Sequence, residues 1–98
     1  MHDRKIQFSN VEIGKIFKID GSYREVVRFE HGVAMLHCRY IPGVPVTSID
    51  VCVCDFDAKK NWHFLPPSES WGEKGFTYNN HDIADSVFNS LVQAQNKN

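Results

Sequence analysis

The chain has 98 residues, 42% of them hydrophobic, and a formal net charge of −1. This length and composition are typical of one small globular domain and exclude a disordered chain, a fibrous repeat and a large multi-domain enzyme. The near-neutral charge gives no overall attraction to nucleic acid or an anionic membrane, and without an apolar membrane-spanning or signal segment we expect a cytoplasmic protein.

The chain is predicted to begin with a β-hairpin. In residues 11–19 four apolar side chains occupy odd-numbered positions, Val11, Ile13, Phe17 and Ile19, and this period of two indicates a strand. Asp20-Gly21 is a strong turn signal, and odd-numbered apolar positions resume over residues 23–29. We therefore expect two antiparallel strands joined by a short loop.

Two registers compete for this hairpin. A two-residue loop sets Phe17 opposite Arg24, whereas a three-residue loop pairs Ile19 with Tyr23 and joins the apolar sets on one face. We expect the three-residue loop. It leaves two charged side chains on the apolar face, those of Lys15 and Glu25. A bulge at Gly14 or a place near the sheet edge would relieve that conflict.

Three further strands are predicted between residues 33 and 65. Residues 33–40 alternate in polarity, and the prolines and glycine of residues 41–45 then interrupt the ladder. Residues 46–56 form a long fourth strand whose two faces are both largely apolar from Val51 onwards, which indicates a central or doubly covered strand. A short fifth strand covers residues 62–65 and ends at two prolines.

The remainder is predicted to be an aromatic loop over residues 66–80 and a helix over residues 81–95. The helix has two adjacent rows of apolar residues spaced by four: Ile83, Val87, Leu91 and Ala84, Phe88, Val92. Two such rows form one broad apolar stripe, so the helix should pack on the sheet. Asn80 is a suitable N-cap for it.

The expected fold class is mainly β (α+β), a five-stranded SH3-like antiparallel barrel or twisted sheet with a C-terminal helix, within a single domain. The run VEIGKIFKIDG at residues 11–21, continued by Tyr23, Val26, Val27 and Phe29, resembles the first hairpin of the KOW-type, SH3-like amino-terminal domain of translation elongation factor P. It is also similar to the opening of many short phage and mobile-element proteins. The resemblance covers about a third of the chain. It implies a small barrel and an accessory or inhibitor protein of a phage or mobile element.

Cysteine and histidine residues offer one set of metal-ligand candidates. Cys38, Cys52 and Cys54 with His63 or His37 would make a Cys₃His set suited to zinc. However, two cysteines in a Cys-x-Cys strand lie about 6–7 Å apart at the backbone, unlike the turn-borne pairs of zinc knuckles. Buried, reduced core thiols are the favoured interpretation. No nucleophile or phosphate-loop motif is present, so we expect no enzyme and no cofactor.

A local basic face gives an alternative function, nucleic-acid binding. In the expected register, four basic side chains face outward: Lys18, Arg24, Arg28 and Arg39. Acidic residues are scattered among them, and phosphate affinity depends on concentrated positive charge. This interpretation therefore ranks below protein binding.

Aromatic side chains in the second half of the chain are candidates for a protein-binding surface. They are Trp62, Trp71, Phe76 and Tyr78, and the proline-rich turn at residues 42–45 accompanies them. Aromatic residues are favoured anchors at interfaces, although the same side chains would also seal a barrel against a helix. The sequence therefore predicts a small non-catalytic module that binds another protein, without a membrane. Nucleic-acid binding is the alternative, a zinc-stabilised Cys/His domain is a further one, and the small core is compatible with a homo-oligomer.

Overall fold

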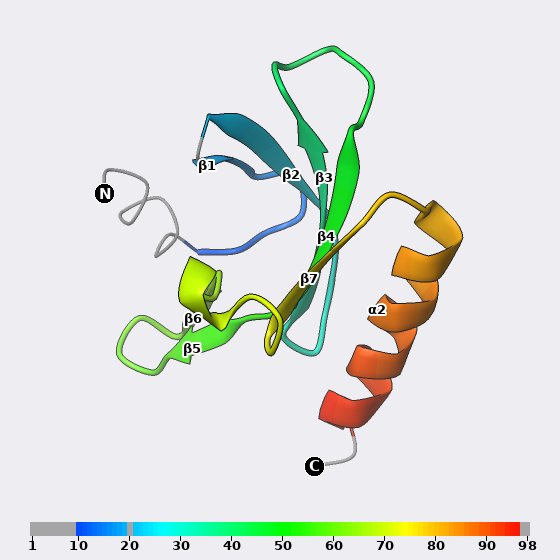
Figure 1. The fold of residues 1–98 in the computed structure, drawn as a ribbon. Coiled ribbons are helices and arrows are strands. Elements are labelled where there is room, and N and C mark those ends of the chain that lie inside the picture. The colour runs from blue at the N-terminus through cyan, green and yellow to red at the C-terminus, as the bar shows by residue number, and fades with distance from the viewer. Residues whose placement is uncertain (1–9, 20, 97–98) are drawn as a thin grey trace.

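The structure is a computed structural model that describes residues 10–19 and 21–96 (Figure 1). Its elements, in chain order, are β1 (Ile16–Ile19), β2 (Ser22–Glu30), β3 (Val33–Arg39), β4 (Ser48–Val53), β5 (Asp55–Asp57), β6 (Trp62–Phe64), the 3-10 helix η1 (Ser68–Ser70), β7 (Gly75–Tyr78) and α2 (His81–Asn96). The predicted mainly β chain with a C-terminal helix is confirmed.

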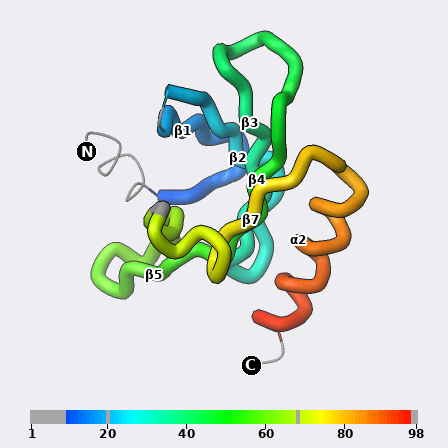
Figure 2. The backbone as a smooth tube through the Cα atoms, in the orientation of Figure 1, coloured from blue at the N-terminus to red at the C-terminus, as the bar shows by residue number. Residues whose placement is uncertain are grey.

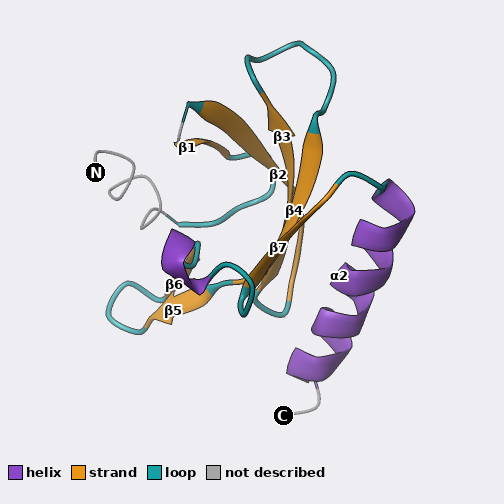
Figure 3. Ribbon diagram, in the orientation of Figure 1, coloured by secondary structure: helices purple, strands orange, loops and turns teal. Residues whose placement is uncertain are grey.

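Five strands form one antiparallel sheet in the order β1-β2-β3-β4-β7, and β5 pairs with β6 in a separate hairpin. Among the described strands β1 and β7 are the two edges of the sheet, and no closed barrel is formed. Helix α2 packs on one face, which we call the helix face, while β5, β6 and η1 lie on the opposite side (Figure 3). That opposite side is the inner face.

The strand predicted over residues 62–65 is present as β6, but its expected place in the main sheet was wrong. Residues 62–64 pair with β5, and residues 75–78, expected to be part of an aromatic loop, supply the fifth strand by pairing with β4. The predicted strand over residues 46–56 is divided at Cys54, whose N–H bonds to the carbonyl of Gly32 at 2.8 Å. After Cys54 the chain leaves the main sheet, and Asp55–Asp57 pairs with β6 in a separate hairpin.

The expected three-residue register of the first hairpin was also wrong. Phe17 pairs with Arg24 and Ile19 with Ser22, which is the register of the two-residue loop. In this register Phe17 and Val26 share the inner face, and a register shift of β2 against β3 between Val26 and Arg28 also brings Phe29 to that face. This bulge changes which alternate positions face the core, so the odd-numbered pattern does not continue through β2.

A second irregularity lies where the sequence suggested one. The N–H of Gly14 donates to the carbonyl of Val26 at 2.8 Å, and the N–H of Val26 donates to the carbonyl of Lys15 at 2.9 Å. Two consecutive residues thus oppose one, which is a β-bulge, and Gly14 has the positive φ of 91° that such a bulge uses. The bulge that the sequence suggested at Gly14 is therefore present.

Each face of the sheet has its own core. The inner face carries buried residues from the first four strands and the segments that cover them: Val11, Phe17, Ile19, Val26, Ala34, Leu36, Cys52, Cys54 and Leu65. On the helix face the buried residues are Val33, Met35, Ile49, Val51, Ala84 and Phe88. The central strand β4 contributes to both cores, which confirms the prediction of a doubly covered strand.

Helix α2 follows the sequence prediction closely. Asn80 caps it, because its Oδ1 accepts hydrogen bonds from the N–H groups of Asp82 at 2.8 Å and Ile83 at 3.2 Å. Phe88 is fully buried against the sheet, whereas Ile83 at the first turn stays half exposed. Within the described part of the chain, no helix has the length and apolar character needed to cross a membrane.

Candidate functional site

The helix covers only part of its face of the sheet. Beyond it lies an open pocket of about 320 Å³, which we call the edge pocket. Its lining comes from β1, β2, β3 and the β3–β4 connection: Ile16, Tyr23, Glu25, Arg39, Pro42, Gly43 and Val44. Figure 2 shows this connection projecting beyond the ends of β3 and β4. The pocket therefore lies between an edge strand and a projecting loop.

Strand pairing places the pocket residues side by side. Ile16 is the cross-strand partner of Glu25, and Tyr23 is the partner of Arg39. Directly paired residues of antiparallel strands project on the same face. All four side chains therefore lie on the helix face, although they come from three different strands.

Arg39 holds the β3–β4 connection against this part of the sheet through two hydrogen bonds. Its Nη1 donates to Oε1 of Glu25 at 3.1 Å, and its Nε donates to the carbonyl of Val44 at 3.0 Å. Gly43 has a φ of 88°, a left-handed conformation that glycine adopts without steric cost and that lets the chain reverse. Arg39 thus connects Glu25 on β2 with the loop that forms one wall of the pocket.

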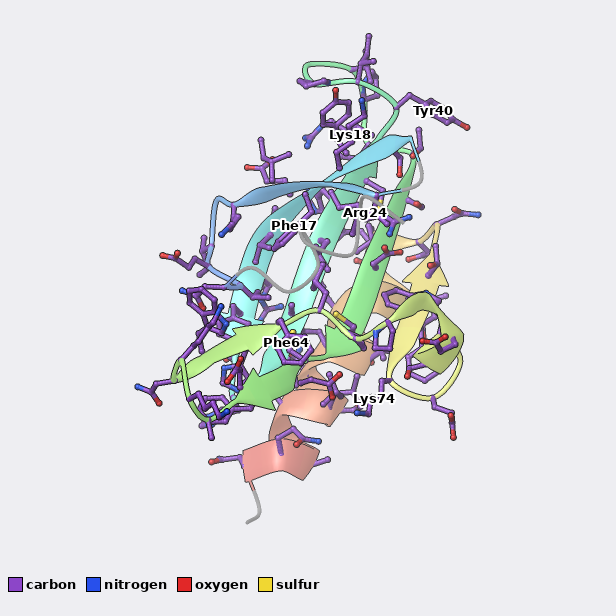
Figure 4. All side chains as sticks on the ribbon, turned by 90° about the vertical axis from the view of Figure 1, so that its left-hand side faces the viewer. Phe17, Lys18, Arg24, Tyr40, Phe64 and Lys74 are labelled. Atoms are coloured by element: carbon purple, nitrogen blue, oxygen red, sulfur yellow. The ribbon has the colours of Figure 1, made fainter. Side chains whose placement is uncertain are left out.

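Exposed apolar side chains surround the pocket. Ile16 is 54% exposed, and Tyr40 and Ile41, which directly precede the loop wall, are 72% and 57% exposed. Figure 4 shows Tyr40 extending away from the body of the protein. Exposed apolar side chains beside a pocket are a common feature of interaction sites.

A smaller pocket of about 230 Å³ continues along the helix face towards the start of α2. Its lining includes His37 of β3 and His81 of α2, whose rings meet edge to face at 5.6 Å between centroids. Burial, followed by the neighbouring His81 and Arg39, lowers the pKa of His37 below its usual 6.5. His81 Nδ1 in turn lies 3.1 Å from Oδ2 of Asp85.

The four basic residues of the alternative nucleic-acid site do not form one free basic surface. Arg24 faces inward in the observed register, with its Nε 3.5 Å from Oδ2 of Asp50. Arg28 lies over the Phe88 ring on α2, 4.2 Å from its centroid, and Arg39 pairs with Glu25. Only Lys18 lacks an ion pair among the described residues, and its ammonium lies 5.5 Å from the centroid of the Tyr23 ring.

The four aromatic candidates are divided among different surfaces. Trp62 is on β6, where Lys60 lies 5.1 Å from its ring centroid. Trp71 packs against the inner core, and Tyr78 packs with the core under α2. Phe76 pairs with Val51 and so shares the helix face with Tyr78. The structure therefore does not bring the four together as a single surface.

The cysteine candidates lie on the inner face. Cys38, Cys52 and Cys54 are free and buried, and in residues 10–19 and 21–96 no group of three or more His, Cys, Asp or Glu side chains is arranged to hold a metal ion. Burial, followed by the charge of Asp50, raises the pKa of Cys38 to about 11. His63 instead contacts the Phe29 and Phe56 rings, at 5.3 and 4.9 Å between centroids.

Sequence reasoning named the loop wall of the edge pocket and Arg39, the latter as a nucleic-acid candidate, and missed the other lining residues. The turn at residues 42–45 was a candidate interface, and Pro42 to Val44 do line the pocket. Ile16 was missed because the expected register did not identify it as an exposed apolar residue on the helix face. The one available signal was that Ile16 is apolar, whereas the other even-numbered residues of the predicted strand are polar or glycine.

Comparison with known proteins adds no relative: no protein-family model, no curated protein and no solved structure matches this chain. The resemblance of the first hairpin to the amino-terminal domain of elongation factor P stays a prediction.

Proposed function

We propose that this protein is a non-catalytic binding module that holds a segment of another protein in the edge pocket. The observation that carries the proposal is the combination of an open pocket of about 320 Å³ with half-exposed Ile16 in its wall and exposed Tyr40 and Ile41 beside it. Water-exposed apolar surface of this kind gains free energy when a partner covers it.

The pocket also has the polar feature that a specific protein contact needs. Glu25 and Arg39 form an ion pair within its lining, and both side chains remain partly exposed. A partner backbone can bond to their remaining acceptor and donor positions, while the apolar walls take its side chains. Apolar walls with a few fixed polar groups are the usual composition of a binding pocket.

Nucleic-acid binding has less support from the same contacts. Arg24, Arg28 and Arg39 each lie beside a carboxylate, at 3.5, 3.2 and 3.1 Å respectively. A phosphate would have to compete with these carboxylates for the guanidinium groups, and the counterion release that drives phosphate binding would be small. We therefore place protein binding first.

The test is affinity capture from the cells that express the protein, followed by mass spectrometry with and without nuclease. Wild type is compared with the pocket variant Ile16→Thr/Ile41→Ser and with the matched control Phe56→Ser/Ile83→Ser. All four positions are more than half exposed, but the control pair lies on β5 and α2.

We expect a nuclease-resistant partner that wild type and the control variant capture and that the pocket variant loses. Circular dichroism of all three proteins checks that they are folded. A partner lost equally from both double variants, or lost on nuclease treatment, would contradict the proposal.

A further inference from the structure

A pair of histidines on the helix face has contacts that the proposed protein-binding site does not explain. His37 of β3 and His81 at the start of α2 meet edge to face, with 5.6 Å between their ring centroids. Both line the smaller pocket of about 230 Å³, which shares no lining residue with the edge pocket. The two rings are therefore a separate feature, at the place where the helix first meets the sheet.

One ring nitrogen of this pair is buried without a partner. Nε2 of His37 is shielded from solvent and has no hydrogen bond among the described residues. Such an atom is unfavourable in a folded protein, and a bound ion or water molecule is one reason for a native protein to keep it. The lone pair of an imidazole nitrogen is also a good ligand for transition metals. Nε2 of His37 is therefore a candidate metal ligand.

His81 has the surroundings of a metal-ligating histidine. Its Nδ1 lies 3.1 Å from Oδ2 of Asp85, one turn further along α2. When Nδ1 donates to this carboxylate, the lone pair of the ring is on Nε2. Metal-binding histidines usually donate their second ring nitrogen in this way, because the hydrogen bond fixes the tautomer and makes the ligating nitrogen more basic. Asp85 is thus suited to orient His81 towards an ion.

The spacing of the two rings fits one shared ion. Two imidazoles bound to a tetrahedral metal at about 2.0–2.1 Å from each nitrogen have their ring centres roughly 5 Å apart. The observed 5.6 Å is close to that value, so a small movement of the exposed His81 side chain would bring both nitrogens to one ion. The adjoining pocket has space for the ion and for water molecules at its remaining coordination positions.

The ion would have two histidine ligands rather than a complete protein cage. Residues 10–19 and 21–96 contain no group of three or more His, Cys, Asp or Glu side chains arranged to hold a metal, so water supplies the other positions. Imidazole ligands suit Zn²⁺, Ni²⁺ and Cu²⁺, whereas Mg²⁺ prefers oxygen ligands. The ligand chemistry therefore selects a divalent transition metal.

We propose that His37 and His81 bind one divalent transition-metal ion between β3 and α2, with Asp85 as the residue that orients His81. The bound ion connects the sheet to the first turn of the helix. Because it binds the folded protein, its presence raises the stability of the fold as its concentration rises. The site is independent of the edge pocket and of the partner proposed for it.

The experiment titrates isotope-labelled full-length protein with Zn²⁺ in a chelator-free buffer at neutral pH, and Mg²⁺ is the control ion. Calorimetry gives the affinity, and NMR of the imidazole nitrogens identifies those that bind the ion. The variants are His37→Gln, His81→Gln and Asp85→Asn. The matched controls are His31→Gln, at an exposed turn, and Asp82→Asn, which removes another carboxylate from the first turn of α2.

We expect one Zn²⁺ to bind, to change the Nε2 signals of both His37 and His81, and to be released by EDTA. The affinity should fall more than about tenfold in His37→Gln and in His81→Gln, because even the loss of an outer-shell partner costs about 10–100-fold. Asp85→Asn should lose about tenfold for that outer-shell reason. The two control variants should bind as wild type does, and Mg²⁺ should cause none of these changes.

Three outcomes would overturn this inference. One is the absence of saturable Zn²⁺ binding, and another is a signal change at only one ring of the pair or at neither. The third is binding of wild-type strength in His81→Gln, an exposed position whose substitution leaves the core intact. Circular dichroism checks that each variant is folded, and if His37→Gln is not, His81→Gln decides the question. An Asp85→Asn protein that binds normally would reject the orienting role of Asp85.

Discussion

Arg24 and Asp50 face each other on the inner face of the sheet, although β3 lies between their strands. Arg24 Nε is 3.5 Å from Oδ2 of Asp50, and the Oδ1 of Asp50 accepts a hydrogen bond from Thr77 at 2.7 Å. Trp71 Nε1 donates to the same threonine hydroxyl at 3.1 Å. One polar network thus connects β2, β4, β7 and the loop before β7.

Removing the Asp50 carboxylate should destabilise the fold. Asp50 is only 3% exposed, and Asp50→Ala would leave Thr77 without its acceptor and Arg24 without its opposite charge. Hydrogen bonds to charged groups contribute about 1.5–3 kcal/mol, so we expect a loss of that order in the free energy of unfolding. Asp50→Asn keeps an acceptor for Thr77 and should lose less. Urea unfolding measures both, with exposed Glu73→Gln as the control. An Asp50→Ala protein as stable as wild type would contradict the structural role of the network.

The close packing of Trp71 on Gly75 gives a second prediction. A Cβ at Gly75 would overlap the six-membered ring of Trp71, so Gly75→Ala must displace the indole or the strand. Overpacking of this kind costs about 1–3 kcal/mol, and the Trp71 fluorescence, measured in a Trp62→Phe background, should change. In a Trp71→Ala background the same glycine substitution should cost much less. Additive effects in this double-mutant cycle would show that the ring does not lie over Gly75.

The environment of His37 makes stability depend on pH. His81, Arg39, Glu25 and Asp85 surround it, and burial together with the first two lowers its pKa in the folded state. The unfolded chain has the ordinary value near 6.5 and therefore binds the proton first as pH falls. The free energy of unfolding should be insensitive to this group above about pH 6.5 and fall below it, until the folded pKa is passed.

His37→Gln should flatten this dependence between about pH 7 and pH 5. The control is His31→Asn, at the exposed β2–β3 turn, which should keep the wild-type slope. Urea unfolding across the pH series provides the comparison. Identical slopes for wild type and His37→Gln would assign the pH dependence to another group.

The buried thiols should be slow to react while the protein is folded. Burial raises the pKa of Cys38 to about 11, and the hydrogen bond with Cys54 together with burial raises that of Cys52 well above its usual value. The thiolate is the reactive form, so iodoacetamide at about pH 8 should label the native protein far more slowly than the urea-unfolded protein. Mass spectrometry follows the labelling. Rapid native labelling of Cys38 or Cys52 would show that the inner core opens.

Sequence patterns predicted the elements whose interactions are local. The two apolar rows of α2 and the Asn80 cap depend only on neighbours within the helix, and the two-sided burial of β4 follows from its apolar composition. These features needed no knowledge of the chain elsewhere, and the structure has them as predicted.

The rest depends on pairings between distant residues. The bulge between Val26 and Arg28 reverses the alternation of β2, and nothing in the residues themselves marks it. β7 exists because Gly75 to Tyr78 pair with β4, although turn-forming residues surround it in sequence. The edge pocket joins Ile16 to Val44 only after β2 and β3 have paired and Arg39 has bound Glu25 and the loop.

Site-specific photo-crosslinking can show whether a partner binds at the edge pocket. The variants are Tyr40→p-benzoylphenylalanine beside the pocket and Phe56→p-benzoylphenylalanine on β5, two exposed aromatic positions on different parts of the surface. We expect irradiation in the native cells to join a partner to the protein at position 40 and not at position 56, and the yield should be lost in an Ile16→Thr background. Crosslinking at position 56 alone, or at position 40 with no dependence on Ile16, would contradict it.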